Sequence, residues 1–158
     1  MRAVVQRVKE AFVSVENNVT GQIENGLLVY LGVAKGDSEK DADILAEKIA
    51  NLRIFSDSQD KMNLSILDLI EAEAGKKNTG VLAISQFTLL GDCKKGRRPY
   101  YGEAADPEPA KKLYEYFMRK IRGHGLLCES GVFQAHMEVH SINDGPVTIL
   151  LDSALLKN

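Results

Sequence analysis

The sequence predicts an α/β domain of the α+β type, with largely antiparallel strands and two main helices packed on them. Short segments with alternating apolar residues fill the first 33 positions and return near the end of the chain. Two stretches with helical spacing and clear start signals lie between them, near 38–52 and 106–123. With 158 residues, 44% of them hydrophobic and 27% charged, we expect one globular domain over 1–158.

Composition excludes several classes of function. No apolar run approaches the roughly 20 residues of a membrane span, and the first residues lead directly into an alternating strand, so we expect a cytoplasmic protein without a membrane partner. The net charge of −2 gives no general basic excess, so any contact with RNA must rest on a local patch. Cys93 and Cys128 lack metal-binding spacing and are expected to be reduced and structural. We expect no cofactor and no metal.

The N-terminal third predicts an antiparallel meander. Asn17-Asn18 reads as a turn, and Asn25-Gly26 is a strong signal for a two-residue hairpin. The strands expected around these turns are 3–8, 11–16, 19–23 and 27–33.

The helices follow from start signals and apolar spacing. Ser38 with Asp41 resembles a capping box, and an apolar stripe follows it to residue 52. Residues 62–65 suggest a short strand or extended loop, and 68–74 a brief helix that Gly75 ends. Asp106-Pro107 predicts the start of a second long helix, because aspartate suits the N-cap and proline the first turn.

The stretch 80–89 carries the first candidate site. Val81–Ile84 is an apolar run that predicts a buried strand, and Ser85, Gln86 and Thr88 follow directly with Phe87 between them. One interpretation is a strand that leaves the core and becomes polar. The other is a site in which hydroxyls, an amide and backbone N–H groups hold an ester carbonyl.

The segment 91–99 is a basic loop flanked by glycines. It lacks the Lys-Ser/Thr ending of a P-loop. A solvated surface loop and a contact with a phosphate backbone through Lys95, Arg97 and Arg98 both remain open, since arginine pairs with phosphate in bidentate fashion.

The C-terminal part alternates sharply and predicts a strand at 132–139, a turn at 143–146 and a last strand at 147–151. The face with His136, Glu138 and His140 is better explained by solvent exposure than by a metal site.

A catalytic triad is weakly supported. Thr88 or Ser85 would need a nearby base, and no motif places a histidine beside either residue. Glycine in Gly145-Pro146 lets a ligand approach the backbone, whose carbonyls could accept hydrogen bonds from an ammonium group, although a plain turn is the alternative.

Several ordered motifs resemble the D-aminoacyl-tRNA deacylase (D-tyrosyl-tRNA(Tyr) deacylase) family over nearly the whole chain. They are Met1 to Val8, Asn25 to Val29, Ser85-Gln86-Phe87-Thr88, Lys95-Gly96-Arg97-Arg98-Pro99, Gly131 to Met137, and Asn143-Asp144-Gly145-Pro146-Val147-Thr148. The resemblance implies a small fold around a curved, barrel-like, largely antiparallel sheet. It also implies a homodimer that hydrolyses the ester between a D-amino acid and the 3′-terminal adenosine of tRNA.

The resemblance also implies roles for single residues. Ser85, Gln86 and Thr88 would line the pocket as the catalytic set, with Phe87 beside the adenine and Met137 walling the adenosine site. The Gly145-Pro146 element would reach into the partner's pocket and exclude L-amino acids by clash, braced by Arg7. Glycyl-tRNA, including glycine mischarged on tRNA(Ala), would then also be hydrolysed, since glycine has no side chain to clash.

Water assisted by the ribose 2′-hydroxyl is favoured over Thr88 as the nucleophile. A departure from the family is His136, where aspartate is common, and alternation predicts that His136 faces away from Met137 and the pocket. The alternatives to a deacylase are a non-catalytic tRNA- or nucleotide-binding module and another ester or amide hydrolase that uses Thr88 covalently.

Overall fold

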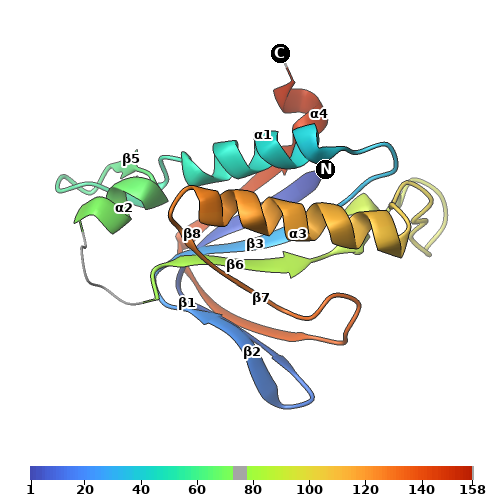
Figure 1. Ribbon diagram of the computed structural model, residues 1–158, viewed down its shortest axis with the longest axis horizontal. Helices are drawn as coiled ribbons and strands as arrows, with labels where there is room; N and C mark the ends of the chain where they lie inside the picture. Colours follow the sequence, from blue (N-terminus) through green and yellow to red (C-terminus); the bar gives the residue numbers. More distant parts are fainter. Residues whose placement is uncertain (73–77, 158) are drawn as a thin grey trace.

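A curved sheet forms one layer of the molecule, and helices α1 and α3 lie across one face of it (Figure 1). The computed structural model describes residues 1–72 and 78–157. This arrangement confirms the predicted class, a largely antiparallel curved sheet with two main packed helices. The elements in chain order are β1 (Arg2–Val15), β2 (Asn18–Ile23), β3 (Gly26–Gly32), α1 (Glu39–Ala50), β4 (Phe55–Ser56), β5 (Met62–Leu64), α2 (Ile66–Ala72), β6 (Gly80–Ser85), the 3₁₀-helix η1 (Phe87–Leu90), α3 (Pro107–Gly123), β7 (Leu127–Ser130), β8 (Glu138–Asp152) and α4 (Ser153–Leu156).

The N-terminal strands form one long antiparallel hairpin, so the predicted meander is wrong. β2 pairs with the second half of β1, and β3 pairs with the first half. The two pairings share one register, from Ala11 opposite Ile23 to Val8 opposite Gly26. Asn25-Gly26 is therefore a bend between two strands that follow the same partner, and the chain does not reverse there.

The reversal lies instead at Glu16 and Asn17, whose φ angles are 50° and 63°. A two-residue hairpin loop of type I′ needs positive φ at both central positions, which asparagine tolerates better than most residues. The two strands predicted at 3–8 and 11–16 are one strand, β1.

Two parallel strands extend the sheet beyond β3. β6 pairs with β3, and β7 pairs with β6, both in parallel. Parallel neighbours need a crossover connection, and α1 and α3 lie in these two crossovers. The predicted buried strand Val81–Ile84 lies within β6. All of its residues are buried, as expected for a strand covered on both faces.

One long strand, β8, takes the place of the two strands and the turn predicted for 132–151. It runs antiparallel to nearly the whole of β1. Gln6 lies opposite Thr148 and Val8 opposite Asn143, so residues 144–147 form a bulge opposite Arg7. The strand prediction is wrong for 132–137, which precede β8 and contain a turn.

The helix predictions at the two crossovers are confirmed. The Ser38–Asp41 capping box is present at the start of α1, and α3 begins at Pro107 with Asp106 as its N-cap residue. The brief helix predicted at 68–74 is α2, and its last two predicted residues lie outside the described residues. In the described ranges, no helix has the length and apolar character of a membrane span.

Candidate active site

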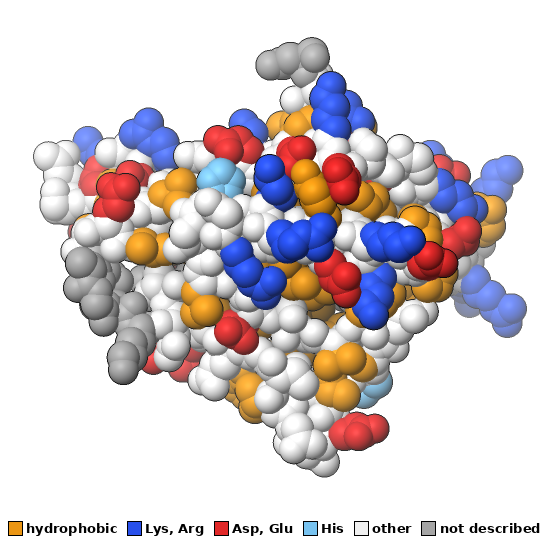
Figure 2. All heavy atoms as spheres, viewed as in Figure 1, with side chains coloured by type: hydrophobic (Ala, Val, Ile, Leu, Met, Phe, Trp, Pro, Cys, Tyr) orange, Lys and Arg blue, Asp and Glu red, His pale blue; other side chains and the backbone are white. Residues whose placement is uncertain are grey.

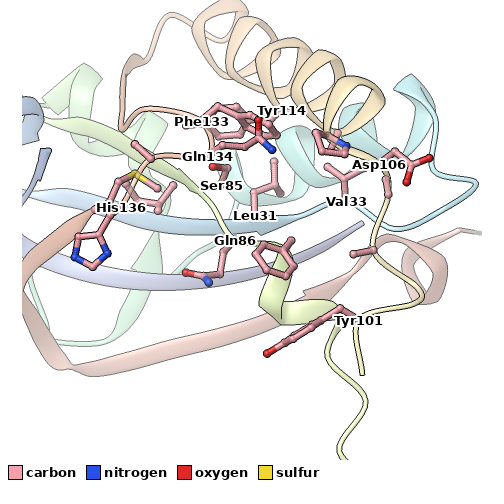
Figure 3. Close-up of a pocket in the computed structure, with 18 of the residues that line it drawn as sticks. Leu31, Val33, Ser85, Gln86, Tyr101, Asp106, Tyr114, Phe133, Gln134 and His136 are labelled. Atoms are coloured by element: carbon pink, nitrogen blue, oxygen red, sulfur yellow. The ribbon is translucent and has the colours of Figure 1, made fainter. Parts of the chain in front are cut away.

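A cavity of about 650 Å³ opens at the carboxyl end of β6. It lies between the sheet, the start of α3 and the segment that leads into β8 (Figure 3). Its apolar wall is formed by side chains from β3 and the residue after it, β6, α3, β8 and the segments before α3 and β8, which are Leu31, Val33, Ile84, Ala104, Ala105, Pro107, Ala110, Tyr114, Phe133, Ala135, Met137 and Val139. The polar and aromatic lining residues are Ser85, Gln86, Phe87, Tyr101, Asp106, Gln134 and His136.

Four residues that the sequence predicted for the site line this cavity: Ser85, Gln86, Phe87 and Met137. β6 ends at Ser85, and the backbone N–H of Gln86 donates to the carbonyl of Leu31 at 2.8 Å, which extends the pairing between β3 and β6 by one residue. The chain then turns into η1. The polar side chains are therefore carried at the end of a rigid, buried strand.

Thr88 lies on η1 just outside the cavity lining. Its hydroxyl oxygen accepts a hydrogen bond from the side-chain amide of Gln86. Phe87 is 58% exposed, and its ring meets Tyr101 edge to face with the centroids 5.1 Å apart. This aromatic pair lines the cavity at one rim of its opening, and Tyr101 lies across from Phe133 and Tyr114 in Figure 3.

The inner wall is held by a buried tyrosine. The Tyr114 hydroxyl on α3 donates to the carbonyl of Ala83 at 2.7 Å, which ties the helix to β6. Burial raises the pKa of Tyr114 well above its ordinary value, and the protonated hydroxyl is the donor in this hydrogen bond. The ring also packs against Phe133 with the centroids 6.0 Å apart.

The segment 133–137 supplies lining residues that sequence reasoning missed. The alternating pattern predicted the exposure correctly, because Gln134 and His136 are exposed and their neighbours in 133–137 are half-buried. The backbone nevertheless turns there and is not a strand. Gln134 and His136 both line the cavity, so the expectation that His136 faces away from the pocket is wrong. The sequence signal for this segment was the motif that begins at Gly131. In the structure, a Cβ atom at Gly131 would lie 2.4 Å from the sulfur of Met137.

The other part of the predicted site lies away from this cavity. Gly145 and Pro146 are exposed on the bulge of β8, and the peptide bond between them is cis. Arg7 is only 9% exposed, and its Nε donates to the carbonyl oxygen of Asp144 at 3.2 Å. Its Nη1 donates to the carbonyl of Ile54 at 2.6 Å. Arg7 therefore links the bulge of β8 to the segment directly before β4.

The basic loop is a distinct feature near the rim. Its base is closed by paired backbone hydrogen bonds between Asp92 and Tyr100, and Lys95, Arg97 and Arg98 are exposed beyond it. Figure 2 shows other lysines and arginines mixed with acidic side chains over α1 and α3. Several of those are paired, for example Lys112 with Glu108 at 2.8 Å. Within residues 1–72 and 78–157, the three loop residues make no ion pair.

Among the described residues, the three histidines are not grouped with other ligands as a metal site would require. His140 stacks on Phe12 with the centroids 4.5 Å apart, and His124 lies 3.4 Å from a carboxylate oxygen of Glu47. In the described part of the chain, no three His, Cys, Asp or Glu residues are grouped to hold a metal. Cys93 and Cys128 are both free, as predicted.

The model of a family described as D-Tyr-tRNA(Tyr) deacylase matches residues 4–152. The chain belongs to this family. A D-aminoacyl-tRNA deacylase of Koribacter versatilis is 60% identical over 153 residues, which cover 97% of each chain. A protein of the same name from Thermotoga petrophila is 54% identical over 156 residues, or 99% of each chain. Membership of the family places the chain among hydrolases that cleave the ester bond of D-aminoacyl-tRNA.

Two solved structures share the fold. A c-Myc DNA unwinding element binding protein is 37% identical, with a TM-score of 0.84 over 96% of this chain and 98% of its own. A probable eukaryotic D-amino acid tRNA deacylase has a TM-score of 0.77 over 95% of this chain and 97% of its own. At 16% identity, the second likeness concerns the fold alone.

Proposed function

We propose that the cavity at the end of β6 holds the 3′-terminal adenosine of a D-aminoacyl-tRNA, and that the chain hydrolyses its ester bond. The observation that carries the proposal is the convergence of Ser85, Gln86, Phe87 and Met137 on one cavity. Apolar and aromatic walls suit a nucleobase, and a few polar groups at one end suit the ribose and the ester. Translation supplies such substrates, so we place the activity in the cytoplasm.

The chemistry we propose relies on positioning. The amide of Gln86 donates to the Thr88 hydroxyl, which leaves that hydroxyl free to donate its own proton toward an ester carbonyl. On the described residues, the first backbone N–H groups of η1 have no partner within this helix, and they suit the developing oxyanion. The nucleophile is then water, assisted by the 2′-hydroxyl of the ribose.

Among the described residues, no histidine or carboxylate is hydrogen-bonded to the Thr88 hydroxyl, which supports this choice. Among the hydrogen bonds of the described residues, the one that involves the Thr88 hydroxyl comes from an amide, and an amide N–H cannot remove a proton. His124 and His140 have other partners. His136 lines the cavity, but the described residues place no hydrogen bond between it and Thr88.

Selection against L-amino acids is proposed to come from Gly145-Pro146 of a second copy. These residues are exposed and lie outside the cavity of their own chain, while Arg7 anchors the bulge that carries them. If backbone carbonyls of this element fix the α-ammonium group, the L side chain points into the bulge and the D side chain points to solvent. Glycine clashes with neither, so glycyl-tRNA(Ala) is a further proposed substrate.

The homodimer has support from strand β8. Of its two edges, one pairs with β1, and on the described residues the other pairs with no strand. Two apolar side chains of this strand are strongly exposed, Ile142 at 50% and Leu150 at 78%. An open strand edge with exposed apolar residues favours association with another copy.

Hydrolysis of three matched substrates tests the activity. Purified protein is incubated with D-tyrosyl-, L-tyrosyl- and glycyl-tRNA, and the release of free amino acid is measured. We expect release from the D and glycyl forms and not from the L form. Release of neither tyrosine enantiomer above background would favour a non-catalytic tRNA-binding module instead.

Co-expression of two inactive variants tests the shared site. Phe87→Ala damages the cavity and Gly145→Ala damages the bulge, so a mixed dimer keeps one intact site. Random pairing should restore about a quarter of the wild-type activity, because half of the dimers carry one of two sites. No recovery in a sample shown to contain mixed dimers would contradict a pocket completed by the partner.

A further inference from the structure

Gln134 has an unusual backbone for its residue type. Its φ of 64° lies in the left-handed region, which glycine adopts freely and other residues at a cost. Four other non-glycine residues of the described chain have positive φ, and all are Asn, Asp or Glu: Glu16, Asn17, Asp60 and Asn78. None of these four lines the cavity, and Gln134 does. Strained backbone conformations cluster at functional sites, and this one lies at a cavity wall.

The turn that carries Gln134 is fixed on both sides. The backbone N–H of Ala135 donates to the carbonyl of Val132 at 3.1 Å, which closes the turn. Phe133, the preceding residue, packs against Tyr114 of α3, and Met137 lines the cavity after it. The side chain of Gln134 is therefore presented at the cavity margin by anchored neighbours, and Figure 3 draws it beside Phe133 and Ser85.

The free amide at this position suits a nucleobase. The hydrogen bonds of the described residues include none from the Gln134 side chain, whereas one of the two amide N–H groups of Gln86 donates to Thr88. A glutamine amide offers a donor and an acceptor side by side, and it can bind the 6-amino group of adenine and a neighbouring ring nitrogen together. The apolar surface next to it, from Phe133 and Met137, suits the faces of a purine ring.

We propose that Gln134 reads the identity of the terminal base, through paired hydrogen bonds between its side-chain amide and the edge of adenine. This inference rests on the proposed binding of the 3′-terminal adenosine in the cavity. Gln134 would then determine specificity for the base, at a position where its positive φ costs conformational free energy. Selection for the amide accounts for glutamine at a position that glycine would occupy without strain.

Binding of two stable substrate analogues tests the inference. The probes are 3′-(D-tyrosylamino)-3′-deoxyadenosine, whose amide link is not hydrolysed, and the same compound with purine in place of adenine, which lacks the 6-amino group. Calorimetry should give wild-type protein an affinity about tenfold higher for the adenine compound, the size expected for one paired contact. Gln134→Gly should bring the ratio of the two dissociation constants close to one.

The glycine variant separates recognition from folding. Glycine adopts positive φ without strain, so the Tm of Gln134→Gly should be unchanged or raised. Asp60→Gly is the matched control, because Asp60 has a φ of 58° and lies outside the cavity. This control should behave like Gln134→Gly in Tm and keep the full preference for adenine.

Two results overturn the inference and leave the proposed function in place. One is equal binding of both compounds by wild-type protein, and the other is an undiminished preference for adenine in Gln134→Gly. A third result would also contradict the proposed function. If neither compound binds and D-tyrosyl-tRNA is not hydrolysed, the cavity does not bind the terminal adenosine, and this inference fails as well.

Discussion

The cavity at the end of β6 and the bulge of β8 carry the two parts of the predicted site, and they are built in opposite ways. Ser85 and Gln86 are half-buried and line a hollow within one chain. Gly145 and Pro146 are exposed on a projection that lines no part of that hollow. A hollow and an anchored projection on one chain are the complementary shapes that a site shared between two copies requires.

The anchoring of the bulge gives the largest expected effect. Gly145 has a φ of 125°, which side chains rarely allow, and a Cβ atom there would lie 2.9 Å from an Arg7 nitrogen. Gly145→Ala must therefore shift the projection or the Arg7 side chain that anchors it. Because a shift of about 1 Å at a reacting centre costs on the order of a hundredfold, kcat/KM for D-tyrosyl-tRNA should fall by at least that factor.

Gly125→Ala is the control for this substitution. Gly125 also has positive φ, at 81°, but a Cβ atom there meets nothing within 4 Å and the residue lies beyond the end of α3. It should lower Tm through the backbone alone and leave kcat/KM unchanged. Equal losses of activity in the two variants would show that general destabilisation, and not the projection, explains the effect.

Removal of the Thr88 hydroxyl sharpens the comparison from the side of the cavity. If Thr88 only positions the ester, Thr88→Ala should lower the single-turnover rate by about a hundredfold, the lower end of the range seen for lost oxyanion contacts. A covalent nucleophile would cost roughly a millionfold. Thr88→Ser keeps the hydroxyl and should stay close to wild type. Loss of all measurable turnover in folded Thr88→Ala would restore the covalent alternative.

The cavity could be predicted further from the sequence than the bulge. Local patterns are sufficient to predict β6 and the polar residues at its end, because an apolar run followed by Ser85 and Gln86 indicates both. The start of α3 at Pro107 was equally readable from Asp106-Pro107. These elements depend on short-range chemistry, namely hydrogen-bond capping and burial of an apolar run.

Long-range pairing explains what could not be predicted. Asn25-Gly26 has the composition of a hairpin turn, but β1 is long enough to pair with β2 and β3 in turn, and the chain only bends. Gly145-Pro146 reads as a turn in isolation, and its place in a continuous strand depends on the register with β1. The turn at Gln134 was hidden because its residues alternate in exposure as a strand would.

The basic loop allows a test of how RNA reaches the two regions. Arg97→Ala and Arg98→Ala should each raise KM about fivefold and reduce the salt dependence of tRNA binding by about one unit of slope, because each removes one phosphate contact. Lys48→Ala on α1 removes an exposed charge away from the cavity and is the matched control. An unchanged salt slope in both arginine variants would show that the loop is a solvated surface loop that makes no contact with the phosphate backbone.

His136 gives the smallest expected effect and the sharpest test of the water mechanism. It lines the cavity, yet the described residues show no hydrogen bond from it to Thr88. His136→Asn keeps a polar side chain of similar reach without a titratable group. The single-turnover rate on D-tyrosyl-tRNA should change by less than about twofold at each pH between 6 and 8, since loss of a general base costs 10²–10⁴-fold. If the variant instead loses at least a hundredfold and its rate no longer depends on pH, the imidazole activates the nucleophile, and assistance by the ribose hydroxyl is unnecessary.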